Sequence, residues 1–250
     1  MRDLKGKTIL VTGASRGIGA AIARGAAETG ARVILHASAT GGAIDKVAAE
    51  IGAPASDVIC EDLSAADAGF RLFDRALDAA RKIDGVVNNA GVYIESRLNG
   101  LRSDWTESWS TTHAVNVQAP ADVCHAAIGH FRQTGGGIVV NVASRAGHRG
   151  DSIDGAAYAA SKGAVLAMTK TFARQLAGEN MLFYAVAPGW VETRMAPKDI
   201  EARARAVSEI PLGRVADPEE VAAIAIFLLK GACASATGAT FDVNGASYVR

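Results

Sequence analysis

The sequence has no excess of charge of either sign. Its 250 residues include 26 Lys plus Arg and 26 Asp plus Glu, so the formal net charge is zero. Nucleic acids and anionic membranes attract proteins through an excess of basic charge or a basic block, and this chain has neither. We therefore expect no nucleic-acid partner and no binding to a membrane surface.

Cysteine is scarce as well. The three cysteines, Cys60, Cys124 and Cys233, lie far apart and show none of the CxxC or Cys–His spacings of zinc and redox sites. We expect reduced cysteines with packing roles and no metal site.

Long apolar runs are also missing. The longest one, at 221–229, is far shorter than a membrane span. The N-terminal MRDLKGKTILVTG passes from charged residues into a strand-like run, without the apolar stretch of a signal peptide. The expectation is a cytoplasmic enzyme.

Aromatic residues make up only 6% of the chain, which is rich in Ala, Gly and aliphatic residues. Short runs rich in Val and Ile alternate with longer Ala-rich segments of helical period. This alternation predicts an α/β fold with a doubly wound parallel sheet, helices on both faces, and one domain over residues 1–250. The predicted strands are 8–11, 32–35, 58–60, 85–87, 138–142, 182–186 and 240–243; the predicted helices are 18–29, 44–51, 70–81, 105–131 (one long or two abutting), 156–176 and 218–230.

Polar residues follow several of these strands. Gly13, Asp62, the segment 88–91, Ser144 and Pro188 each come directly after a predicted strand. In a doubly wound sheet, ligands bind outside the carboxyl ends of the strands. We therefore expect these positions to form one site.

Tyr158 and Lys162 lie one turn apart in a predicted helix. A phenol has an ordinary pKa of about 10 and is a poor acid at neutral pH. An ammonium at about 4 Å is worth roughly 4 kcal/mol at an intermediate dielectric, enough to make Tyr158 usable as an acid or base. An isolated Tyr/Lys pair is more often a solvated helix face, so the interpretation depends on the rest of the chain.

The turn TGASRGIG, at 12–19, joins the first predicted strand to the first helix. Its glycines let the backbone approach a pyrophosphate, and the helix N-terminus supplies amide donors. The spacing is GxxxGxG rather than GxGxxG, so the turn alone is weak evidence.

Together, TGASRGIG, NNAG, AVNV, Ser144, YAASK and PGWVET resemble the short-chain dehydrogenase/reductase family over essentially the whole chain. The resemblance implies a Rossmann-like seven-stranded parallel sheet and a nicotinamide-dependent oxidoreductase. It also implies that Ser144 binds the substrate oxygen, Tyr158 passes the proton, Lys162 lowers the phenol pKa and holds the ribose, and Asn116 anchors a water. These four residues form the predicted catalytic tetrad.

The end of the second strand, HASAT at 36–40, has no acidic residue to hold the ribose hydroxyls of NAD. Arg16 and Ser38 are placed to meet a 2′-phosphate, so we expect NADP(H), with NAD(H) as the alternative. Arg16 on a surface turn, and Asp62 as a helix cap, are the structural alternatives. The predicted cofactor-binding residues are Gly13, Ser15, Arg16, Gly17, Ile18, Gly19, Ser38, Asp62, Leu63, Asn88, Asn89, Ala90, Gly91, Tyr158, Lys162, Pro188, Gly189, Val191 and Thr193.

The C-terminal half resembles bacterial 3-oxoacyl-[acyl-carrier-protein] reductases, so an acyl thioester is the first substrate hypothesis. A sugar or polyol-type dehydrogenase is the second, and a non-catalytic NADP-sensing protein is a third of another class. The charged loop at 145–157 either contacts a polar or anionic substrate or faces solvent. The resemblance further implies a substrate lid at about 190–212, with Trp190, Met195 and Ile210 as lining residues, and a homotetramer or else a dimer.

Overall fold

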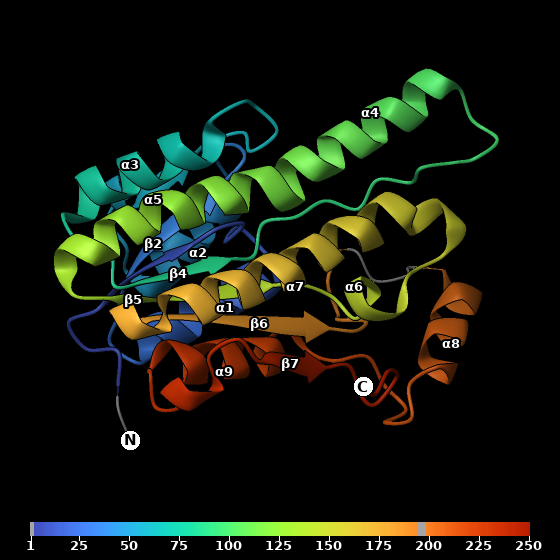
Figure 1. Cartoon of the computed structure of the whole chain (residues 1–250). Coiled ribbons are helices and arrows are strands. Elements are labelled where there is room, and N and C mark those ends of the chain that lie inside the picture. The colour runs from blue at the N-terminus through green and yellow to red at the C-terminus, as the bar shows by residue number, and fades with distance from the viewer. Residues whose placement is uncertain (1–2, 195–198) are drawn as a thin grey trace.

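The computed structural model describes residues 3–194 and 199–250, and a seven-stranded parallel sheet forms its centre (Figure 1). The strand order is β3-β2-β1-β4-β5-β6-β7, so the chain reverses its direction of winding between β1 and β4. The predicted doubly wound sheet is confirmed. The strands are β1 (Thr8–Val11), β2 (Arg32–Ala37), β3 (Val58–Cys60), β4 (Gly85–Asn88), β5 (Gly137–Val142), β6 (Met181–Pro188) and β7 (Thr240–Val243).

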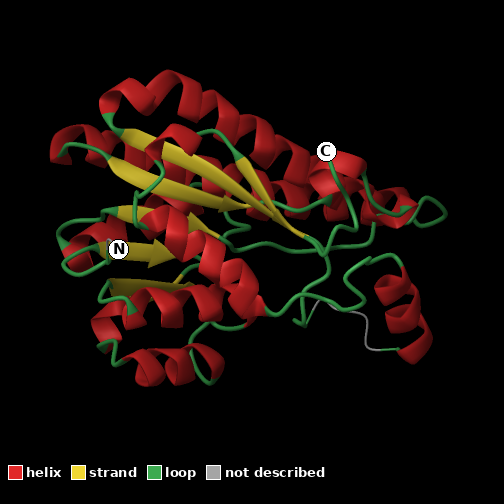
Figure 2. Cartoon of the chain, turned by 90° about the horizontal axis from the view of Figure 1, so that it is seen from below, coloured by secondary structure: helices red, strands yellow, loops and turns green. Residues whose placement is uncertain are grey.

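Helices cover both faces of the sheet, as Figure 2 shows. One buried cluster joins the sheet to α1 (Gly17–Glu28), α2 (Ala43–Ile51) and α9 (Pro218–Leu229). A second cluster joins the other face to α3 (Ala68–Ala80), α5 (Ala119–Thr134) and α7 (Ala156–Leu176). Because both faces are covered, the central strands β1 and β4 and most of β5 and β6 are buried along their length rather than at alternate residues.

The predicted strands 8–11, 58–60 and 240–243 and the predicted helix 156–176 have the bounds found in the structure. The predicted helix 105–131 is instead two α-helices, α4 (Arg102–His113) and α5, joined by a π-helical turn η2 (Ala114–Gln118). Pro120 has no N–H, so the carbonyl four residues earlier, that of Asn116, lacks its usual helical donor. The proline therefore accounts for a change in the hydrogen-bond pattern at Asn116.

Two short helices lie near the carboxyl end of the sheet. The sequence did not predict α6 (Ala146–Arg149), which directly follows Ser144. Helix α8 (Ile200–Ser208) lies within the predicted lid, and the Asp199 side chain caps it by accepting from the Ala202 N–H at 2.7 Å. Met195 lies outside the described residues. None of the helices in the described part of the chain is long and apolar enough to cross a membrane.

Candidate active site

The glycine turn between β1 and α1 is closely packed. A Cβ on Gly13 would lie 2.9 Å from the Ala90 Cα, and Gly13 has a φ of +65°, which strains any residue with a side chain. A Cβ on Gly19 would lie only 2.2 Å from the Gly13 carbonyl oxygen. Glycine is therefore required at both positions, and the N-terminus of α1 stays accessible to an anion.

The segment after β4 is hydrogen-bonded to this turn. The Thr12 hydroxyl accepts from the N–H groups of Asn89 and Ala90, both at 2.9 Å. The Asn89 amide donates to the carbonyls of Thr12 at 2.9 Å and Gly13 at 3.2 Å. The two motifs that the sequence placed at one edge of the sheet are thus in contact. Thr12 was not predicted as a site residue, although its position directly before Gly13 was the available signal.

Asn116 holds the start of the next loop. Its Oδ1 accepts from the Val92 N–H at 2.8 Å, and its Nδ2 donates to the Val92 carbonyl at 2.9 Å and to the Ser161 hydroxyl at 3.0 Å. Ser161 in turn donates to the Tyr158 carbonyl at 2.7 Å. Asn116 therefore connects the β4 loop to α7. Because both side-chain donors are used, the predicted water would have to be held by acceptor atoms of this residue.

Ser144 and Tyr158 meet at the carboxyl end of β5. The Ser144 side chain lies close enough to the Tyr158 phenol to act on its pKa as a hydrogen-bonding group, and the Ser144 oxygen accepts from the Ala146 N–H at 3.1 Å. Burial raises the pKa of the Tyr158 phenol to about 12, although the Ser144 hydrogen bond acts in the opposite direction. The Tyr93 ring packs against the Tyr158 ring, with 5.1 Å between their centres. Tyr158 is therefore protonated at neutral pH and poised as a proton donor.

The Lys162 ammonium is buried behind Tyr158. Its Nζ donates to the Val142 carbonyl at 2.8 Å and lies 5.7 Å from the centre of the Tyr158 ring. Burial lowers the pKa of Lys162 to about 8. A Cβ on Gly91 would lie 3.4 Å from this Nζ and 3.3 Å from the Asn116 Oδ1. The missing side chain at Gly91 thus leaves a cradle faced by two polar groups, which suits a ribose or a nicotinamide.

The predicted effect of Lys162 on the pKa of Tyr158 does not match the structure. The phenol pKa is raised, because burial outweighs the hydrogen bond from Ser144. The amine donates to the Val142 carbonyl, and Lys162 is not among the groups that shift the pKa of Tyr158. The predicted helical spacing of the two residues is correct, but how deeply each is buried depends on tertiary packing, which spacing along the chain does not determine.

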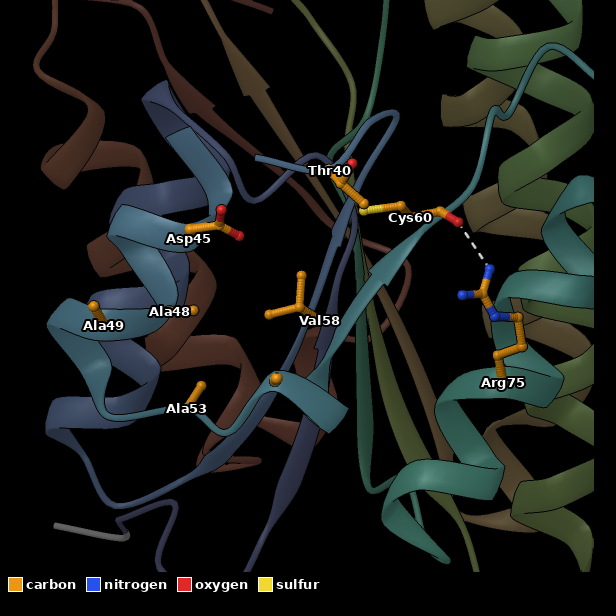
Figure 3. A pocket seen from close by; sticks show the side chains of 9 residues that line it. Thr40, Asp45, Ala48, Ala49, Ala53, Val58, Cys60 and Arg75 are labelled. Carbon is orange, nitrogen blue, oxygen red and sulfur yellow. Dashed lines mark hydrogen bonds between the residues drawn. The ribbon is translucent and has the colours of Figure 1, made fainter. Parts of the chain in front are cut away.

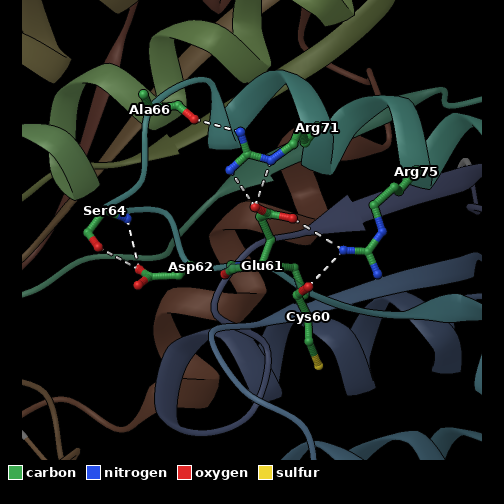
Figure 4. Close-up of polar contacts among 8 residues, drawn as sticks. Cys60, Glu61, Asp62, Ser64, Ala66, Arg71 and Arg75 are labelled. Atoms are coloured by element: carbon green, nitrogen blue, oxygen red, sulfur yellow. Dashed lines mark hydrogen bonds and ion pairs between the residues drawn. The ribbon is translucent and has the colours of Figure 1, made fainter.

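The predicted adenosine end lies at the carboxyl ends of β2 and β3. Ser38 and Arg16 are exposed. Asp62 accepts from the N–H and the hydroxyl of Ser64, at 2.9 and 2.8 Å, and these bonds lower the pKa of its carboxyl group (Figure 4). The alternative of a helix cap is thus correct only in part, since Asp62 caps a turn while α3 begins later, at Ala68. Leu63 is buried in the core below.

The loop after β6 forms the opposite side. Pro188 ends β6, and the Gly189 N–H donates to the Val243 carbonyl at 2.9 Å. A Cβ on Gly17 would lie 3.0 Å from the Thr193 Cγ2, so this loop and the glycine turn approach each other closely. Val191 is buried and pairs with Ala216 in an isolated bridge. The predicted cofactor-binding residues after β1 and those after β6 therefore face one another.

The charged loop after Ser144 divides into a buried and an exposed part. The Arg145 side chain is only 7% exposed, lies 5.9 Å from the centre of the Trp190 ring, and has one buried nitrogen, Nη1, without a hydrogen-bond partner. Glu209, after α8, lies 3.5 Å from Arg145 and 3.2 Å from the exposed Arg149. The solvent-facing alternative is therefore wrong for Arg145, which is packed beside Trp190 and Glu209.

A hollow of about 490 Å³ lies at the β3 edge of the sheet (Figure 3). It borders the segments that lead to the adenosine end, because Thr40 follows Ser38 in the chain and Cys60 precedes Asp62. Its lining is mostly small side chains of α2 and β3, and includes none of the tetrad: Thr40, Asp45, Ala48, Ala49, Ala53, Ala55, Val58, Cys60 and Arg75.

Known proteins share both the sequence and the fold. A family model described as Enoyl-(Acyl carrier protein) reductase matches residues 13–246. The chain is 34% identical to a 3-oxoacyl-[acyl-carrier-protein] reductase from Vibrio harveyi, over 99% of both chains. It is 35% identical to the enzyme of the same name from Thermotoga maritima, over 97% of this chain and 98% of the other.

The chain is also similar to a solved structure from Beutenbergia cavernae, described as an NAD(P)-dependent gluconate 5-dehydrogenase with NADP bound at low occupancy. It superposes with a TM-score of 0.89 at 32% identity, over 97% of each chain. Family membership, which the sequence motifs predicted, is thereby confirmed.

Proposed function

The chain belongs to the short-chain dehydrogenase/reductase family and is an oxidoreductase acting on a CH–OH or C=O group, and we propose that it is an NADP(H)-dependent 3-oxoacyl thioester reductase. The observation that carries the chemistry is the proximity of the Ser144 and Tyr158 side chains at the end of β5, close enough for Ser144 to act on the pKa of the phenol. These two residues lie at the same carboxyl edge of the sheet as the glycine turn and the Gly91 cradle. The 3-oxoacyl reductases among the relatives support the choice of substrate.

In the proposed reaction, a nicotinamide cofactor supplies the hydride that reaches the carbonyl carbon. The Ser144 hydroxyl donates a hydrogen bond to the carbonyl oxygen, and Tyr158 transfers its proton to that oxygen as the C–H bond forms. The Lys162 ammonium stabilises the negative charge that develops there. The Tyr158 oxygen, left as a phenolate when the secondary alcohol forms, would then regain a proton from solvent.

NADP(H) is the proposed cofactor. Arg16 is exposed beside the glycine turn, and Ser38 is exposed after β2, so both are accessible to a 2′-phosphate. No acidic residue occurs in the segment 36–40, where a carboxylate would repel that phosphate. The NADP bound to the Beutenbergia cavernae protein agrees with this choice.

A sugar or polyol-type dehydrogenase is the second candidate. Arg145, buried beside Ser144 with one unpaired nitrogen, favours a polar or anionic substrate over a simple acyl chain. The description of the Beutenbergia cavernae protein as a gluconate dehydrogenase points in the same direction.

A substrate panel with the purified enzyme separates these candidates. NADPH oxidation is followed with an acetoacetyl thioester, neutral keto-sugars and keto-sugar acids, and each is repeated with NADH. The proposal predicts the highest kcat/KM for the thioester with NADPH. Preference for keto-sugar acids supports the second candidate, whereas tight NADPH binding without turnover of any substrate supports a non-catalytic NADP sensor.

We also propose a cytoplasmic homotetramer. Helix α7 exposes small residues, Ala160 and Ala167, on the side away from the sheet, and the Trp105 and Trp109 rings of α4 are half-exposed. Such faces suit packing against a second copy. Light scattering on the eluted protein distinguishes a tetramer from the alternative dimer.

A further inference from the structure

His36, at the end of β2, connects the two ends of the candidate cofactor site. It is only 2% exposed. Its Nδ1 accepts from the Gly13 N–H at 3.2 Å, and its Nε2 lies 3.0 Å from the Glu61 carbonyl oxygen. Because the Gly13 N–H can only donate and the Glu61 carbonyl can only accept, the ring must be neutral, with its proton on Nε2.

The backbone of His36 adds a second contact to the glycine turn. Its carbonyl accepts from the Ala14 N–H at 2.8 Å, so His36 receives hydrogen bonds from two successive amides of the turn. Gly13 is also the residue that packs against Ala90 and accepts from the Asn89 side chain. A movement of Gly13 would therefore displace both motifs that face the cofactor.

The other side of the ring is attached to a firmly held strand end. The Glu61 N–H donates to the Ala37 carbonyl at 3.1 Å, and its carboxylate accepts from Arg71 at 2.7 and 3.0 Å and from Arg75 at 3.2 Å (Figure 4). Asp62, the predicted adenine contact, is the next residue. The ring thus joins the glycine turn to a strand end that two arginines hold in place.

The bond between Nδ1 and the Gly13 N–H is lost when the ring gains a proton, whereas the bond from Nε2 to the Glu61 carbonyl is kept. An imidazolium has N–H groups on both nitrogens, so Nδ1 would then point a hydrogen at the Gly13 N–H. Burial lowers the pKa of His36, while the hydrogen bond to the Glu61 carbonyl and the Glu61 carboxylate, directly after β3, raise it and Arg75 of α3 lowers it. Other charged groups on the neighbouring elements are Arg71 on α3, Asp62 after β3, and Arg16 in the glycine turn.

We propose that His36 is a positioning residue of the cofactor site, whose neutral ring holds Gly13 of the glycine turn and whose protonation breaks that bond and weakens cofactor binding. This inference rests on the proposed use of NADP(H). It predicts an enzyme whose cofactor affinity falls when the surroundings become acidic, through a residue outside the catalytic tetrad.

The test compares the Kd of NADPH for the wild type, His36→Gln and His36→Leu between about pH 8 and pH 5.5. Gln offers an acceptor and a donor but does not titrate, so it should preserve the affinity at pH 8 within about threefold. Leu should weaken it by about fivefold or more, because the Gly13 N–H loses its acceptor. The control is His125→Gln, which removes an exposed histidine from α5.

The 2′-phosphate itself titrates near pH 6, so the decisive quantity is the difference between wild type and His36→Gln. We expect the wild-type Kd to rise at least about threefold more than that of His36→Gln between about pH 8 and pH 5.5, because only the wild-type ring can gain the proton that breaks the Gly13 bond. Equal pH dependence in the two proteins would overturn the inference. Absence of NADPH binding to the wild type at pH 8 would instead refute the proposed function.

A measurement on the unaltered protein covers the case in which the variants do not fold. With ¹⁵N-labelled histidine, NMR gives the tautomer and pKa of His36 with and without saturating NADP⁺. The inference requires the Nε2–H tautomer at pH 8 and a lower pKa in the complex. A His36 pKa that is unaffected by NADP⁺ would overturn it.

Discussion

The Lys162 amine lies 5.7 Å from the centre of the Tyr158 ring and donates its hydrogen bond to the Val142 carbonyl at 2.8 Å. Burial raises the pKa of Tyr158 to about 12 and lowers that of Lys162 to about 8. The phenol therefore keeps its proton, while the amine loses its own more readily than a surface lysine. Both shifts have consequences that solution measurements can detect.

Carbonyl reduction should depend on pH through Lys162. The Tyr158 proton is present up to strongly alkaline pH, whereas the ammonium charge is lost as pH rises through about 8. The kcat/KM for reduction should be level below that pH and fall above it, because the cation that stabilises the developing oxyanion disappears. A profile measured with saturating NADPH checks this, and a level profile up to about pH 10 would contradict it.

Lys162→Met should stabilise the fold and remove most of the activity. In the wild type, a pKa lowered from 10.5 to about 8 corresponds to a cost of about 3 kcal/mol for burying the charge. The variant avoids this cost but loses the hydrogen bond to Val142, which offsets about 1–2 kcal/mol of the gain. The folded pKa lies below the unfolded value, so the gain should be complete below about pH 8 and vanish above pH 10.5. Urea unfolding at several pH values measures it. A variant less stable than the wild type at pH 7 would disprove this account of Lys162.

Asn116→Ala should loosen the loop after β4. The side chain is buried and satisfies both backbone groups of Val92, so its removal should cost about 2–3 kcal/mol in the free energy of unfolding. Because Gly91 precedes Val92, we also expect a higher Kd for NADPH. Ser110→Ala, an exposed change on α4, is the matched control. Unchanged stability and an unchanged Kd in Asn116→Ala would show that the hydrogen bonds to Val92 contribute neither to stability nor to cofactor binding.

Arg16→Ala should reduce kcat/KM with NADPH by about tenfold to a hundredfold and leave that with NADH nearly unaltered, because a charge-assisted hydrogen bond to a phosphate is worth about 1.5–3 kcal/mol. Arg24→Ala is the control, since Arg24 pairs with Glu50 at 2.8 Å on the surface of α1. An equal loss with both cofactors would show that Arg16 does not contact the 2′-phosphate.

The sequence predicted the layers of the fold and the edge of the sheet at which the site residues lie, because both follow from local patterns. Apolar periodicity located the strands. Because the carboxyl ends of parallel strands lie at one edge of the sheet, Gly13, Ser144 and Pro188 had to lie at that edge. Gly13 and Gly19 were recognisable because only glycine tolerates such close backbone contacts.

The remaining features depend on which residues meet across the sheet. His36 bridges to Glu61 only because β2 pairs with β3 in a register that places His36 opposite Ile59. The burial of Arg145 depends on how Trp190 and the segment after α8 pack against it. The pKa of Lys162 depends on its depth behind Tyr158. None of these follows from spacing along the chain.

The most direct test of the central claim compares Tyr158→Phe with Tyr93→Phe. Both remove one phenol oxygen from rings that pack together, but Ser144 acts on the Tyr158 phenol, whereas the Tyr93 hydroxyl contacts Ser152. With the best substrate of the panel, we expect kcat for Tyr158→Phe to fall by about 10²–10⁴ with an almost unchanged Kd for NADPH. Tyr93→Phe should keep its kcat within about threefold. Equal turnover by Tyr158→Phe and the wild type would contradict the assignment of Tyr158 as proton donor.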